Sequence, residues 1–267
     1  MLADWLGRPT DAALLLGLST MRVAVAFLLV PLFTQDLIPA LIRNALFLAL
    51  AMLGLLVQDV RPMTLGGWQW AVLYGREALM GAALGFLYAG LMWSFEMAGQ
   101  LIDNKVGATQ AQVQDPMSGH TTSLTGAFLA RLASWVFMAS GGFLLFAALL
   151  LDSFALWPLH GDWQLRQAAS VVFEAEFGRM LRLALLVAAP ALVLLYLVDG
   201  VLGLINRYAQ QLNVFSLSMS LKAVVGHGVL LLQLGSLVAL MNDELLARAA
   251  VVKTLLGQLF GPGGPTN

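Results

Sequence analysis

Six ionisable side chains that lie within strongly apolar stretches are the first candidates for chemistry. They are Arg22, Arg76, Glu77, Glu96, Asp199 and Lys222. Charges are expensive in a lipid environment, so such residues mark an ion or proton pathway, or ion pairs within an assembly. Arg76 and Glu77 are adjacent and do not face each other on a helix, and Glu96 lies too far along the chain to pair with Glu77. The spacing therefore favours packing or interface contacts over a relay.

The sequence offers no pattern of an enzyme or a metal site. Its histidines, His120, His160 and His227, are far apart, and it has no cysteine. Metal ligation needs clustered donors. A Gly-x-Ser-x-Gly elbow and a phosphate-binding loop are also missing from the sequence. We therefore expect no enzymatic activity, no metal and no cofactor.

The segment from Asp103 to Ser123 is long, polar and rich in small side chains. Gln110, Gln112 and Gln114 alternate with apolar residues, and a turn follows at 115–119. Loops of this length are usually functional or disordered. Non-helical backbone at membrane depth survives only inside protein or around water. The residues thus leave open an ordinary external loop, which they favour, or a plug in a cavity. One of Thr121, Thr122 and Ser123 is expected to cap the helix that follows.

The composition decides which elements must position these residues. Of the 267 residues, 60% are hydrophobic and 11% are charged, against about 45–50% and about 25% in soluble domains. Such a chain has too few polar residues to form the water-exposed surface of a soluble protein. The composition therefore indicates a multi-pass membrane protein. The net charge of −1 gives no reason to expect nucleic acid. We predict an all-α membrane protein.

Six charge-poor segments are long enough to cross a membrane as helices. They are residues 12–33, 39–57, 68–102, 124–154, 171–208 and 213–241. The third and fifth exceed the thickness of a bilayer and must tilt, kink or project from it. Glycine pairs, Gly81 with Gly85 among them, predict close helix packing, as does Gly226 beside His227. The distribution of Lys and Arg favours cytoplasmic termini.

Three further segments complete the predicted organisation. Residues 157–170 are polar and separate the first four helices from the last two. Residues 242–260 carry an apolar stripe and predict an amphipathic helix. Residues 261–267, rich in Gly and Pro, predict a disordered end.

An ordered set of motifs along the chain resembles one family. The motifs are Arg22 with Pro31, Ile38–Arg43, Arg76–Gly81, Gly99–Ala108, Asp115–Gly119, Ser140–Leu144, Asp152–Phe154, Gln211–Phe215 and Ser220–Lys222. Together they resemble the FliR/SctT family (also called HrcT, YscT or SpaR) of type III secretion export-apparatus membrane proteins. The runs at 102–108, 115–119 and 140–144 favour the injectisome branch over the flagellar one. Gln210 departs from the family's usual Pro, and Lys105-Val106 from its usual Gln-Arg.

The resemblance implies an architecture and partners. Long, kinked helical hairpins of such proteins stack in a spiral, hetero-oligomeric export gate in the bacterial inner membrane, partly raised into the periplasm. Residues 1–156 would be similar to the SctR-like (FliP-like) subunit and residues 171–260 to the SctS-like (FliQ-like) subunit. The implied partners are those two subunits, an SctU-like (FlhB-like) subunit and unfolded secreted proteins in transit.

The resemblance also implies roles for particular residues. The loop at 103–123 would plug the pore until substrate is exported, through Val106, Gly107, Thr109, Gln110, Gln112, Gln114, Asp115, Pro116, Met117, Ser118 and Gly119. Gln211, Leu212, Asn213 and Phe215 would contact partner subunits, and Arg76, Asp199 and Lys222 would be buried charges between helices or subunits. An alternative reading is a secondary transporter or ion channel that uses the intramembrane charges.

Overall fold

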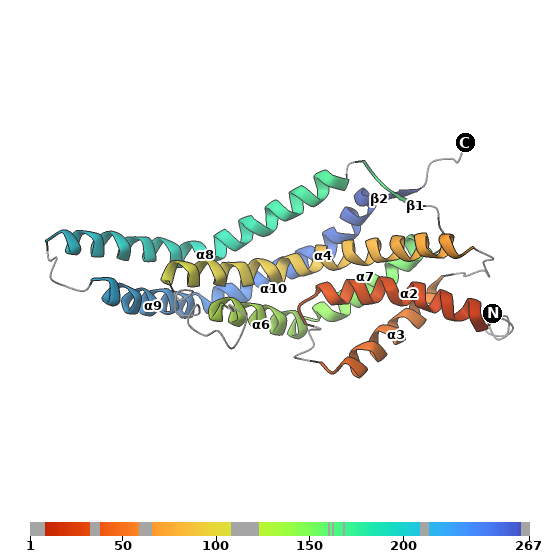
Figure 1. The fold of residues 1–267 in the computed structure, drawn as a ribbon, viewed down its shortest axis with the longest axis horizontal. Coiled ribbons are helices and arrows are strands. Elements are labelled where there is room, and N and C mark those ends of the chain that lie inside the picture. The colour runs from red at the N-terminus through yellow and green to blue at the C-terminus, as the bar shows by residue number, and fades with distance from the viewer. Residues whose placement is uncertain are drawn as a thin grey trace. The chain divides into compact units, whose positions relative to one another are not determined.

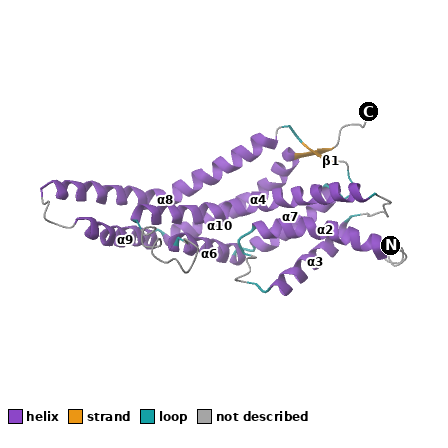
Figure 2. Ribbon diagram, in the orientation of Figure 1, coloured by secondary structure: helices purple, strands orange, loops and turns teal. Residues whose placement is uncertain are grey.

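The elements of the fold come from a computed structural model of the chain. It describes residues 9–32, 38–58, 66–107, 123–159, 161, 163–167, 169–208 and 214–262. Helices account for almost all of these residues (Figures 1 and 2). The helices are α2 (Pro9–Leu29), α3 (Ala40–Val57), α4 (Gly67–Val106), α6 (Leu124–Ala139), α7 (Gly142–Leu156), α8 (Ala169–Tyr208), α9 (Val214–Leu232) and α10 (Leu234–Leu259). Two short strands are β1 (Trp163–Leu165) and β2 (Phe260–Pro262).

Four helices in the described part of the chain are long and apolar enough to cross a membrane. They are α2, α3, α4 and α8, and the total rises to six if the pairs α6–α7 and α9–α10 are each one broken span. The 40 residues of α4 and of α8 correspond to about 60 Å of helix at about 1.5 Å per residue. A bilayer core measures about 30 Å. The helical class and the excess length of these two helices agree with the sequence-based expectation.

Two of the predicted segments are interrupted. The segment expected at 124–154 ends as α6 at Ala139 and resumes as α7 at Gly142, with Gly141 at φ +75°. The segment expected at 213–241 breaks at Gln233, where the helix axis bends by 55°. Beyond that break α10 runs on to Leu259, so the amphipathic stretch at 242–260 is the continuation of a longer helix. Each of these two expected segments is therefore a broken helix, and the amphipathic stretch does not form a helix of its own.

The chain forms two compact units, each assembled from separate stretches of sequence. The first, unit 1, comprises residues 1–90, 141–176 and 245–267, and unit 2 comprises residues 91–140 and 177–244. Both units draw residues from either side of the connection at 157–170. The predicted likeness of 1–156 and of 171–260 to two different partner subunits stays a prediction.

Unit 1 has a core of aromatic rings and closely packed helices. Phe27 of α2 stacks on Phe47 of α3 at 5.6 Å between ring centroids and meets Phe146 of α7 edge-on at 4.9 Å. A Cβ at Gly81 would lie 2.4 Å from the Arg22 carbonyl oxygen, and one at Gly85 would lie 2.6 Å from the carbonyl oxygen of Ala26. The predicted packing role of this glycine pair is confirmed, because only glycine lets α4 lie so close to α2.

The strands of unit 1 join the connection after α7 to the end of the chain. They pair antiparallel, with Trp163 opposite Pro262 and Leu165 opposite Phe260. The ring of Phe260 is buried and lies 6.1 Å from the ring of Trp157. Residues 261 and 262 are therefore ordered in β2, which corrects the expected disordered end at its first two residues; residues 263–267 lie outside the described part.

Unit 2 contains the end of α4 together with α6, most of α8, and α9. A Cβ at Gly99 of α4 would lie 2.5 Å from the backbone nitrogen of Gly126, so α4 and the first turn of α6 touch backbone to backbone. A Cβ at Gly226 of α9 would lie 3.2 Å from Val106 Cγ2, which confirms the predicted close packing at this glycine. These contacts fix the two described ends of the 103–123 segment.

Candidate functional site

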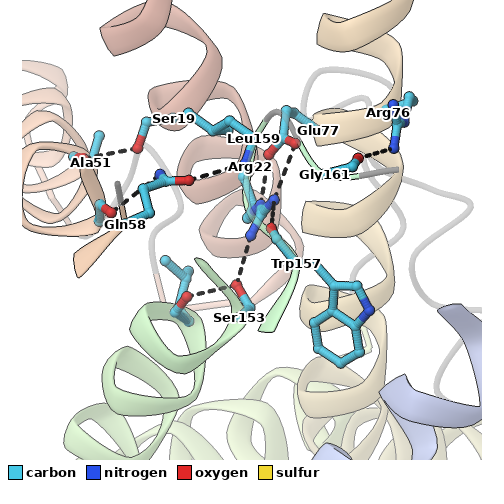
Figure 3. Close-up of polar contacts among 12 residues, drawn as sticks. Ser19, Arg22, Ala51, Gln58, Arg76, Glu77, Ser153, Trp157, Leu159 and Gly161 are labelled. Atoms are coloured by element: carbon cyan, nitrogen blue, oxygen red, sulfur yellow. Dashed lines mark hydrogen bonds and ion pairs between the residues drawn. The ribbon is translucent and has the colours of Figure 1, made fainter. Parts of the chain in front are cut away.

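A buried ion pair between Arg22 and Glu77 is the most enclosed charged contact that the structure describes (Figure 3). Arg22 Nε donates to Glu77 Oε2 at 2.6 Å, and Nη2 donates to Oε1 at 3.0 Å. The two side chains are 0% and 1% exposed. The planar guanidinium thus binds the carboxylate through two parallel hydrogen bonds, the strongest geometry for such a pair.

The remaining donors of Arg22 bind the region around the end of α7. Nη1 donates to Ser153 Oγ at 3.2 Å and Nη2 to the Trp157 carbonyl at 2.8 Å, while the guanidinium lies 4.3 Å from the centre of the Phe154 ring. Every side-chain nitrogen of Arg22 therefore has a partner. Full pairing holds the charges in place, as expected of a structural ion pair and unlike a group that exchanges protons.

Further polar contacts surround this pair and tie the same elements together (Figure 3). Ser19 Oγ donates to the Ala51 carbonyl at 2.8 Å, which joins α2 to α3. Gln58, just after α3, accepts from the Leu159 backbone nitrogen at 3.0 Å. The polar network of unit 1 thus positions α2, α3, α4 and the chain after α7 around one apolar core.

The other candidate charges of α4 bind partners of their own. Arg76 is half-buried and donates to the Gly161 carbonyl at 2.8 Å (Figure 3). Glu96 is also half-buried and accepts from Gln100 Nε2 at 3.3 Å. Arg76 and Glu96 thus bind a backbone carbonyl and a neighbouring amide, contacts that suit packing better than a relay of charges.

Asp199, Lys105 and Lys222 form a second charged cluster, in unit 2. Asp199 Oδ2 lies 2.5 Å from Lys105 Nζ, and Oδ1 lies 3.1 Å from Lys222 Nζ. The Lys105 ammonium also lies 3.8 Å from the centre of the Tyr196 ring. All three charged side chains are half-buried rather than enclosed. The cluster joins three helices, because Lys105 lies in the last turn of α4, Asp199 on α8 and Lys222 on α9.

The described ends of the loop meet at Asp103. This carboxylate is 2% exposed and accepts from Ser123 Oγ at 2.6 Å, from the Thr125 backbone nitrogen at 2.9 Å and from Thr125 Oγ1. Ser123 caps α6 through a 2.8 Å bond from the Gly126 nitrogen to its Oγ, which confirms one of the three predicted caps. His227 Nε2 of α9 lies 3.4 Å from Thr125 Oγ1.

Sequence reasoning did not select Asp103 or Thr125 as functional residues. The available signal was a carboxylate at the end of one helical segment with a Ser-x-Thr sequence at the start of the next. Acidic groups are favourable at helix N-termini, where backbone N–H groups are unpaired. Here the carboxylate comes from the preceding helix. This is a tertiary contact, and residue spacing alone does not predict it.

Most residues predicted for the plug and for partner contacts lie outside the described part. The expected loop start at Asp103 is corrected, because residues 103–106 continue α4 as helix. Of the plug residues, Val106 ends α4 with a buried side chain, and Gly107 follows at φ +89°. Phe215 lies in the first turn of α9. The predicted residues outside the described ranges are Thr109, Gln110, Gln112, Gln114, Asp115, Pro116, Met117, Ser118, Gly119, Gln211, Leu212 and Asn213.

The described side chains offer ion pairs and caps rather than reactive groups. Within the described ranges, no three His, Asp or Glu residues lie together as a metal site would need. Except for Glu96, which binds Gln100 of its own helix, the candidate charges bind residues of other elements and so fix one element against another. The arrangement suits a scaffold that holds a loop in place.

Comparison with known proteins gives this scaffold a family. The model of the bacterial export proteins, family 1, matches residues 13–247. Yop proteins translocation protein T of Yersinia pestis is 30% identical over 228 residues, which cover 84% of this chain and 86% of that protein. Secretion system apparatus protein SsaT of Salmonella typhimurium is 32% identical over 214 residues, covering 76% and 83%.

A flagellar protein is similar at almost the same level. Flagellar biosynthetic protein FliR of Bacillus subtilis is 29% identical over 213 residues, which cover 76% of this chain and 80% of that protein. These relatives are components of export apparatus and not enzymes. With a matching family model over most of its length and an apolar, helical structure, the chain belongs to the bacterial export proteins, family 1, as a membrane protein of the export apparatus.

Proposed function

We propose that this chain is a core channel component of a bacterial type III protein secretion system and that its 103–123 segment plugs the pore until substrate is exported. The observation that carries the proposal is the junction at Asp103, which joins the end of α4 to the start of α6. A long polar segment whose two ends are held together, at a helix of membrane length and at the first half of a broken span, is suited to blocking a channel without crossing it. The similarity to translocation and secretion-apparatus proteins supports the export role.

The proposed partners are SctR-like, SctS-like and SctU-like subunits (FliP-, FliQ- and FlhB-like), with unfolded secreted proteins in transit. Many large apolar side chains of α8 are exposed, Leu185, Val193 and Leu197 among them. Lipid or other subunits must cover such a surface. We favour the injectisome branch and an inner-membrane location partly raised into the periplasm, in a spiral of helical hairpins.

Deletion of residues 110–119 tests the plug. In cells with the assembled apparatus, we expect the deletion to let small ions and solutes cross the inner membrane, because the pore then lacks its polar seal. Asp152→Asn is the matched control, since it only weakens an exposed pair with Lys253 in unit 1. Unchanged permeability with the deleted chain still in the apparatus would refute the plug.

A secondary transporter or ion channel is the alternative, and the half-buried charged cluster at Asp199 is the observation in its favour. It requires that Asp199→Asn abolish solute flux in proteoliposomes that contain this chain alone. The export proposal requires instead that the chain be recovered with other small, hydrophobic subunits and show no such flux. The fully paired state of Glu77 counts against a proton relay at that position.

A further inference from the structure

We propose that Asp103 is the positioning residue that holds both ends of the plug segment in one fixed place. The expected effect on the pore rests on the proposed plug. The claim that Asp103 fixes the start of α6 against the end of α4 does not. Asp103 does not need to touch ions or substrate for this role. It acts through Ser123 and Thr125, which begin the chain again after the segment.

The hydrogen bonds of Asp103 are suited to a fixed anchor. The carboxylate is almost fully buried and accepts from two hydroxyls and one backbone N–H group. The backbone donor belongs to the first turn of α6, where unpaired N–H groups and the helix dipole favour a negative charge. A buried carboxylate with three donors loses much more when one partner leaves than an exposed pair does.

The backbones beside Asp103 also lie in direct contact. Gly99, one turn before Asp103 on α4, touches the backbone of Thr125 and Gly126 so closely that a Cβ would lie 2.5–2.6 Å from their atoms. Such contact leaves no room for a side chain at position 99. Asp103 therefore acts where the two helices already fit, and it fixes which turn of α6 faces α4.

A third helix lies against the same point. His227 of α9 approaches Thr125 Oγ1 at 3.4 Å, and Gly226 packs on Val106 and Ile102 of α4. The end of α4 thus contacts α6 through Asp103 and α9 through Val106 and Ile102.

A pair of engineered thiols measures the position directly. A Cβ at Gly126 would lie 3.1 Å from Gln100 Cγ, close to the spacing between a Cβ and the opposite sulfur in a disulfide. The native chain has no cysteine, so the Q100C and G126C thiols are the sole pair within it. The added Cβ would also lie 2.8 Å from Ser123 Oγ and 3.1 Å from the Glu96 carbonyl oxygen. Because Ser123 Oγ must shift, the thiol background tests mainly the contacts of Asp103 with Thr125, and all rates are compared within that background.

The first readout is the rate of disulfide formation in the assembled apparatus. With Asp103 present we expect rapid formation, and with Asp103→Asn added we expect a rate several-fold lower, because the amide cannot accept from all three donors. Asp103→Glu should restore part of the rate. Asp152→Asn in the same thiol background is the control and should leave the rate unchanged. Failure of the disulfide to form with Asp103 present, or equal rates with Asp103→Asn, would overturn the inference.

The second readout is leakage of small ions across the membrane. Asp103→Asn alone should raise the leak several-fold, and oxidation of the Q100C and G126C pair in that variant should reverse the increase until a reductant is added. A leak that persists with the disulfide formed would show that Asp103 acts on the pore by another route. If deletion of 110–119 gives no leak, the plug fails, while the disulfide rates still decide the positioning role.

Discussion

The pairing of Arg22 with Glu77 shows how much of this molecule depends on a few enclosed charges. Both side chains are buried, and the guanidinium also binds Ser153 and the backbone of Trp157. Removing one member leaves the other as an uncompensated charge in a dry core. The folded state of unit 1 therefore requires both members of the pair to be present together.

Truncation of either member should destabilise unit 1 strongly. We expect Arg22→Ala or Glu77→Ala to lower the free energy of unfolding by about 3–5 kcal/mol, the usual cost of leaving one buried ion unpaired. Arg22→Lys should also be harmful, because an ammonium cannot make the two parallel bonds. Thermal unfolding of the purified protein in detergent measures the effect. The exposed pair of Lys253 and Asp152 supplies the control: Lys253→Ala should cost under about 1 kcal/mol.

The sequence identifies these charges but not their partners. Arg22 and Glu77 stand out because their surroundings are apolar, and this much could be predicted from composition alone. Their pairing depends on how α2 packs against α4, which local spacing does not contain. Asp103 was missed for the same reason, since its partners Ser123 and Thr125 follow a long intervening segment.

At the scale of the helices, glycines decide where elements approach and where they break. Gly81 and Gly85 lie on the face of α4 that meets α2; the sequence pattern predicted close packing at this pair but not its partner helix. Gly141 forms a similar pair with Gly142, but a Cβ there would meet nothing within 4 Å. Its positive φ of +75° supplies the turn between α6 and α7 instead. A pattern of small residues cannot distinguish these two uses.

Substitution of the packing glycines should separate α2 from α4. We expect Gly81→Ala and Gly85→Ala each to cost about 1–3 kcal/mol of stability, because the new methyl group would meet backbone that cannot move aside. Gly75→Ala is the matched control on the same helix, since nothing lies within 4 Å of the added Cβ, and it should be neutral or slightly stabilising. Equal effects at Gly75 and Gly81 in thermal unfolding would contradict the close packing.

Substitution of Gly141 should act through the backbone alone. We expect Gly141→Val to destabilise by about 1–2 kcal/mol, because a β-branched residue is strained at positive φ. Gly141→Asn should be milder, since Asn tolerates the left-handed region. Unfolding of the two variants side by side measures the difference. A loss as large with Asn as with Val would mean that the space around Gly141, and not its φ, sets the requirement.

At the scale of the whole molecule, many large apolar side chains are exposed, and they indicate a surface that something else must cover. Along α8, Val193, Leu197, Val201 and Leu204 recur at helical spacing and are 48–62% exposed. The low charge of the sequence indicated burial, and the structure shows that this chain alone does not provide it on α8. Whether lipid or another subunit covers this face depends on the surroundings of the chain, which cannot be predicted from its sequence alone.

We expect other subunits of the apparatus to cover that face of α8, which bears the exposed apolar side chains, over much of its length. A photo-reactive aromatic residue placed at Val193, Leu197 or Leu204 should then form crosslinks to a second, small hydrophobic protein when the apparatus is assembled. The same probe at Ala188 or Ala191, both buried within this chain, should give few such products and serves as the control. Crosslinks to lipid alone at all three exposed positions would show that the face lies in the bilayer, because a probe on a subunit interface meets protein first. The yield of protein adducts should fall when the apparatus is left unassembled by omitting the other subunits.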